Sequence, residues 1–104
     1  MISILVLHGA NLNLLGKREP EIYGSETLKD INQQLDRQAK SLAVQISTFQ
    51  SNHEGALIDV VHAAANVHQG ILINPGGYTH TSVSLRDALS GVSIPTVEIG
   101  RAHV

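Results

Sequence analysis

The chain has 104 residues, 42% of them hydrophobic, which is enough for one packed domain and argues against disorder. The formal net charge is −2, and the seven lysines and arginines are scattered, which argues against a broad nucleic-acid surface. Cysteine is absent, which excludes disulfide bonds and thiolate metal sites. The apolar run at the N-terminus is only about six residues long, too short for a signal peptide or a membrane span, so we expect a cytoplasmic protein.

Helices are predicted where apolar residues recur every three or four positions. Ser25 is the expected N-cap of a helix from about 26 to 42. A second helix is predicted at 56–65, with its apolar face formed by Ala56, Val60 and Ala64. A third is predicted at 81–89, where Thr81 or Ser82 would cap its start.

Strands are predicted between these helices. Ile2 to Leu7 is almost continuously apolar, as expected for a strand buried on both faces of a parallel sheet. The central strand starts at Gly70, and we expect Pro75-Gly76-Gly77 to end it. The other two strands are predicted at 44–50, nearer a sheet edge, and at 93–99, with Pro95 near its start. The connection at 14–24 is long, and long loops in small domains often cover or line a binding site.

Strands and helices thus alternate as β-α-β-α-β-α-β, which predicts an α/β fold with a doubly wound parallel sheet. The expected strand order is 2-1-3-4, the flavodoxin-like arrangement without its final strand and helix, in a single domain at 1–104, incomplete at its C-terminus. In that order, the turns after the first and third strands meet at the switch point of the sheet. The polar residues expected to converge there are Asn11, Asn13, Asn74, Tyr78 and His80.

Each of these residues has a chemical and a purely structural interpretation. His80 has an ordinary pKa of ~6.5 that suits a general acid or base, but it could equally be a turn histidine bonded to the backbone. Arg18 could lower the pKa of Tyr23 towards that of a useful base, or both could belong to an ordinary loop. Asparagines could stabilise a developing oxyanion, and they are also common in turns, where they tolerate left-handed backbone.

The sequence offers little for a metal or a cofactor, and we expect neither. His8, His53, Glu54 and His80 lack the spacing of a known metal motif. Glycine-rich phosphate-binding motifs are absent as well. Glu98, a carboxylate near the end of a predicted strand, is either a rim residue or a group that orients a histidine.

Four motifs in order resemble type II 3-dehydroquinate dehydratase. They occupy residues 8–18, 22–24, 49–55 and 73–80. The resemblance covers residues 1 to 99 and implies the flavodoxin-like fold, a dodecamer of trimers, and no cofactor or metal. It implies conversion of 3-dehydroquinate to 3-dehydroshikimate by anti elimination of water through an enolate, in the shikimate or quinate pathway.

The resemblance also implies a role for individual residues. Tyr23 corresponds to the base that abstracts the C2 proton, Arg18 to the arginine that lowers its pKa, and Asn11 to a residue linked to enolate stabilisation. Glu98 corresponds to a carboxylate that partners a catalytic histidine. Asp87 corresponds to an aspartate that reaches into a neighbouring subunit. The implied substrate-binding residues are Asn74, His80 and Asp87.

The end of the sequence departs from the family pattern. The family continues after the Glu98 strand with a turn that carries the general-acid histidine, then a strand and a helix, whereas this sequence reads Gly100-Arg-Ala-His-Val104. We therefore expect the general acid to be missing. Two alternatives to an active dehydratase stay open: an inactive truncated subunit, and a flavodoxin-like module that binds a small anion or nucleotide.

Overall fold

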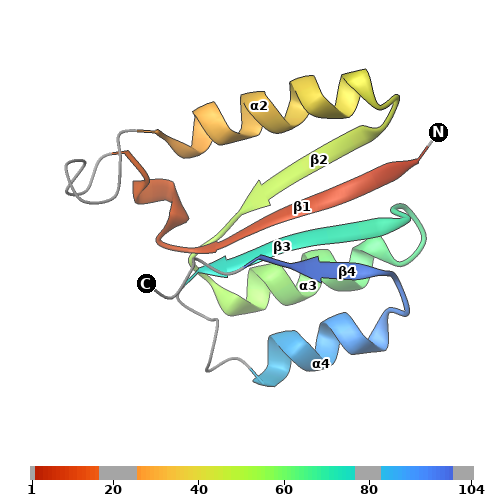
Figure 1. The fold of residues 1–104 in the computed structure, drawn as a ribbon. Helices are drawn as coiled ribbons and strands as arrows, with labels where there is room; N and C mark the ends of the chain where they lie inside the picture. The colour runs from red at the N-terminus through yellow and green to blue at the C-terminus, as the bar shows by residue number, and fades with distance from the viewer. Residues whose placement is uncertain (1, 17–25, 77–82, 100–104) are drawn as a thin grey trace.

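Four parallel strands form one sheet in the computed structural model, which describes residues 2–16, 26–76 and 83–99. The strands are β1 (Ser3–Ala10), β2 (Gln45–Gln50), β3 (Gly70–Gly76) and β4 (Thr96–Glu98). Their order is β2-β1-β3-β4, which confirms the predicted arrangement and places β2 at an edge (Figure 1). The helices are η1 (Leu12–Leu14), α2 (Leu28–Ser41), α3 (Glu54–Ala64) and α4 (Val83–Gly91). Within the described ranges, no helix has the length and apolar character needed to cross a membrane.

The helices cover the two faces of the sheet unequally. In Figure 1, α2 runs above β2 on one side, whereas α3 and α4 lie together on the other side. The main core is between the sheet and the α3–α4 pair. Its buried members are Leu5, Leu7, Leu57, Val61, Ala64, Ile71, Ile73, Leu85 and Ala88. Because side chains alternate along a strand, the residues next to these on β1 and β3 face α2.

Of the two central strands, β1 is longer than predicted and β3 ends where the sequence predicts. β1 continues through Ala10, because His8 pairs with Gln50 of β2 on one side and Ala10 pairs with Gly76 of β3 on the other. β3 ends at Gly76, within the Pro75-Gly76-Gly77 turn that was predicted to end it. Gly76 has a φ of +60°, and a β-carbon there would lie 3.2 Å from the Ala10 nitrogen and collide with the Ala10 carbonyl oxygen. Only glycine therefore allows the two strands to end this close together.

The helix starts and the last strand also differ in detail from the predictions. α2 is capped by Thr27 rather than Ser25: Thr27 Oγ1 accepts from the Asp30 backbone N–H, and the Asp30 carboxylate accepts from the Thr27 N–H. This reciprocal pair satisfies two donors at the helix start. β4 is only three residues long because Ser93, with a φ of 55°, and Pro95 precede it.

The buried face of α3 is one residue out of phase with the prediction. Leu57 and Val61 are fully buried beside Ala64, whereas Ala56 and Val60 are only partly buried. The larger side chains fill the core, so the helix rotates to bury them.

Replacing Leu57 with alanine should lower the free energy of unfolding by about 2–5 kcal/mol, because the side chain is completely enclosed and leaves a cavity. Leu42→Ala is the matched control: the Leu42 side chain is 67% exposed, and its loss should change stability by less than about 0.5 kcal/mol. Urea unfolding measures both values. Equal effects of the two substitutions would contradict this packing.

Candidate functional site

The candidate site lies where β1 and β3 end side by side. His8 pairs with Asn74 and Ala10 pairs with Gly76, so Asn11, which follows Ala10, lies at the same sheet edge as Asn74. The chain leaves β1 towards α2 on one face and leaves β2 towards α3 on the other (Figure 1). This is the switch point predicted from the sequence, where parallel α/β sheets commonly bind ligands.

Asn11 adopts the left-handed backbone conformation, with φ 69° and ψ −1°, and its side chain is exposed. It occupies the N-cap position of η1 but makes no side-chain capping hydrogen bond. Its backbone N–H donates to Asn52 Oδ1 at 2.9 Å. Asparagine tolerates this left-handed conformation, so Asn11 suits the turn. Its carboxamide makes no hydrogen bond that caps η1.

Gln50, the last residue of β2, connects the turn to the sheet. Its Nε2 lies 3.3 Å from the Gly9 carbonyl oxygen, 3.1 Å from Asn52 Oδ1 and 3.5 Å from Asn13 Oδ1. The Asn13 contact is the longest of the three and is exposed. Sequence reasoning did not single out Gln50 or Asn52, although both stand in the 49–55 motif that carried part of the resemblance.

Asn74 supplies a hydrogen-bond donor at this edge. Its side chain is half-buried, and its Oδ1 accepts from the Gly76 backbone N–H at 3.1 Å. Since the oxygen is engaged by the strand's own backbone, the orientation of the carboxamide is fixed. The Nδ2 group is then suited to donate to an oxygen of a bound molecule.

His8 is the buried titratable group closest to this edge, with only 6% of its surface exposed. Its Nε2 lies 2.8 Å from Asn32 Oδ1 on α2, so Nε2 carries the proton and donates. Burial lowers the pKa of His8 below its ordinary value, while the hydrogen bond to Asn32 opposes that change. His8 therefore joins the helix to the sheet, and its burial disfavours the charged form of the imidazole.

A small cavity of about 210 Å³ lies between α2 and the sheet. Its walls are mainly apolar, and His8 and Asn74 contribute the polar groups. The lining residues are Val6, Leu7, His8, Leu12, Leu15, Ile31, Leu35, Leu72, Asn74 and Ile99. The half-buried Asn74 therefore projects towards the α2 face of the sheet.

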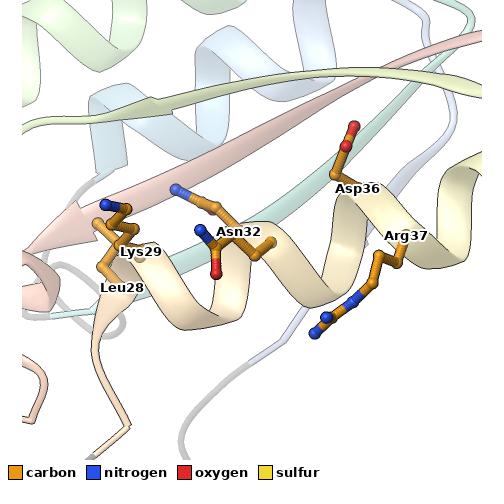
Figure 2. A pocket seen from close by; sticks show the side chains of 6 residues that line it. Leu28, Lys29, Asn32, Asp36 and Arg37 are labelled. Atoms are coloured by element: carbon orange, nitrogen blue, oxygen red, sulfur yellow. The ribbon is translucent and has the colours of Figure 1, made fainter.

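A second hollow follows one flank of α2, and Figure 2 shows that its walls are side chains of this one helix. Leu28, Lys29, Asn32, Gln33, Asp36 and Arg37 line it. None of the predicted site residues contributes to it. Among the lining residues, Asn32 contacts the sheet through its hydrogen bond with His8.

Glu98 lies at the carboxyl end of β4 but on the other face of the sheet. It pairs with Ile73, a core residue under α3 and α4, and its Oε1 lies 3.7 Å from Arg86 Nη2. Arg86 belongs to α4, as does its exposed neighbour Asp87. The structure therefore separates the side chain of Glu98 from that of Asn74, although both residues stand near the same sheet edge.

Three predicted site residues, Arg18, Tyr23 and His80, lie outside the described residues, as does Tyr78. In the part of the chain that is described, no group of three histidines, cysteines or carboxylates is placed to hold a metal ion.

Comparisons with known sequences and structures all point to the same protein family. The family model described as dehydroquinase class II matches residues 2–104. A 3-dehydroquinate dehydratase of Trichodesmium erythraeum is 59% identical over 104 residues, which are all of this chain and 69% of the relative. One from Gloeothece citriformis is 64% identical over 102 residues, or 98% of this chain and 67% of the relative. The crystal structure of a type II dehydroquinase from Butyrivibrio crossotus matches with a TM-score of 0.89 and 46% identity, over 93% of this chain and 68% of that one.

The lowered pKa of His8 predicts a stability that depends on pH. Unfolded histidine binds a proton near pH ~6.5, but folded His8 resists it, so the unfolded chain binds more protons below that pH. With respect to His8, the free energy of unfolding should be highest above about pH 6.5. It should decrease at lower pH, by at most about 1.4 kcal/mol per pH unit. Chemical unfolding at pH 5 to 8 measures this. His8→Asn should remove this component of the pH dependence, and an unchanged slope in that variant would contradict it.

Proposed function

Because this chain belongs to the class II dehydroquinase family, we propose that it dehydrates 3-dehydroquinate to 3-dehydroshikimate, as a hydro-lyase of the shikimate or quinate pathway. The observation that carries the proposal is the match over residues 2–104, which includes the switch-point residues Asn11 and Asn74. Both relatives named 3-dehydroquinate dehydratase match over nearly this whole chain.

The proposed reaction starts at C2 of the substrate, which is acidified by the neighbouring C3 carbonyl. Tyr23, as a phenolate, removes the C2 proton, and the guanidinium of Arg18 lowers the tyrosine pKa to make this possible. The electron pair of the broken C–H bond moves towards C3 and gives an enolate. Asn11, directly or through a water, stabilises the negative charge on the C3 oxygen.

The second half of the reaction forms the conjugated product. The enolate electrons return to form the C1–C2 double bond, and the C1 hydroxyl departs after it takes a proton from an acid, so that one water leaves. No described residue is assigned as this acid. Glu98 corresponds in the family to a carboxylate that partners a catalytic histidine, whereas its contact in this structure is with Arg86.

Substrate binding is proposed for Asn74, His80 and Asp87. The fixed carboxamide of Asn74 supports a donor role, because its oxygen is already bonded to Gly76. Asp87 is exposed on α4, which suits a residue that reaches into a neighbouring subunit. We propose a dodecamer of trimers in the cytoplasm.

Purified protein should turn over 3-dehydroquinate, as measured by the rise of enone absorbance. Tyr23→Phe should lower kcat by about 10²- to 10⁴-fold, because the reaction loses its general base. Circular dichroism of both proteins should be the same. A well-folded chain with no turnover would contradict the proposed activity and favour the inactive subunit.

Asn74→Asp separates the donor role of this residue from its structural role. The carboxylate can still accept from the Gly76 N–H, so the strand end should be preserved, but the donor is lost. We expect KM to rise by about 10-fold or more, in line with loss of a hydrogen bond to a charged group. Steady-state kinetics measure it, with Asn66→Asp, an exposed residue beyond α3, as control. An unchanged KM would show that Asn74 does not bind substrate.

A further inference from the structure

The backbone of Asn11 is held by residues that follow a different strand. Asn11 has a φ of 69°, a conformation that most residues avoid and that asparagine and glycine tolerate. Tolerance alone does not select that conformation, because an asparagine in a free turn samples others. What selects it here is Asn52, whose Oδ1 accepts the Asn11 N–H at 2.9 Å.

Asn52 is itself fixed through the sheet. Its Oδ1 also accepts from Gln50 Nε2 at 3.1 Å, and that same amide lies 3.3 Å from the Gly9 carbonyl oxygen. Gln50 is the last residue of β2, and its backbone is in register with His8 of β1. A continuous set of hydrogen bonds therefore runs from the sheet through Gln50 and Asn52 to the backbone of Asn11.

We propose that Gln50 and Asn52 are positioning residues for the dehydration reaction and act through Asn11. This inference rests on the proposed function, since it gives Asn11 the task of stabilising the enolate. A donor that stabilises a developing oxyanion must be in place before the charge forms, and a misplacement of about 1 Å can cost about 10²-fold in rate. The two residues hold Asn11 at the carboxyl end of β1, beside the strand that carries Asn74.

The competing explanation is that Asn52 only stabilises the turn. These contacts are exposed, so their loss should have little effect on global unfolding in either case. The two explanations differ in what happens once Asn11 has no side chain. If Asn52 acts by positioning Asn11, replacing Asn52 should have no further effect on kcat in a variant that lacks the Asn11 side chain. If Asn52 acts independently of Asn11, the replacement should lower kcat by the same factor in both backgrounds.

A double-mutant cycle tests this difference in the full chain. Asn52→Ala should lower kcat by about 10-fold or more, with KM changed less than 3-fold and the melting temperature close to wild type. The same substitution made together with Asn11→Gly should lower kcat by less than 2-fold relative to Asn11→Gly alone. Glycine is the chosen background because it adopts the left-handed conformation without strain. The inference is overturned if Asn52→Ala lowers kcat by the same factor in the Asn11→Gly background as in the wild-type chain.

Amide hydrogen exchange of Asn11, followed by ¹⁵N NMR, tests the geometry without any need for activity. The Asn11 N–H should exchange at least about 10-fold faster in Asn52→Ala than in wild type, because it loses its acceptor. Asn52→Asp, which keeps an acceptor oxygen, should retain the protection. Equal exchange in wild type and Asn52→Ala overturns the inference whether or not the chain turns over substrate. Protection of Asn11 in a chain without turnover would contradict the proposed function and leave the Asn52–Asn11 contact established.

Discussion

The close pairing of β1 with strands on both of its edges is the constraint on which the site depends. β1 is hydrogen-bonded to β2 from Ser3 to His8 and to β3 from Ile4 to Ala10. Parallel pairing requires every carboxyl end to point the same way, so the turns that follow β1, β2 and β3 gather at one edge. Gly76 makes this possible at the tightest point, because any side chain there would meet the backbone of Ala10. The chemistry proposed for Asn11 and Asn74 follows from that geometry.

The two faces of the sheet have different tasks. The face under α3 and α4 holds most of the buried apolar side chains, and Glu98 lies at its rim against Arg86. The face under α2 holds His8 and Asn74 among apolar residues, and the His8–Asn32 hydrogen bond joins that helix to the sheet. Burial lowers the pKa of this imidazole below its ordinary value.

Sequence reasoning predicted the fold class, the strand order and the meeting of the turns after β1 and β3, but it did not predict which partners hold each polar residue. The residue pattern, taken without the resemblance, did not distinguish the three asparagines. In the structure, Asn13 is bonded to Gln50, Asn11 is held by its backbone N–H, and Asn74 is held by its own strand. The roles of Arg18, Tyr23 and His80 are proposals that rest on the family resemblance. Glu98 was expected near a catalytic histidine, and its observed partner is Arg86.

The sequence by itself determined the alternation of strands and helices and the family, because apolar runs, turn residues and motifs are local properties of the chain. Only the tertiary structure decided which side of α3 is buried and which partners hold the site residues. The hydrogen bonds from Asn11 to Asn52 and from His8 to Asn32 join positions 41 and 24 residues apart. Such contacts depend on how helices and turns distant in the chain are placed against one another, which a local pattern of apolar residues does not specify.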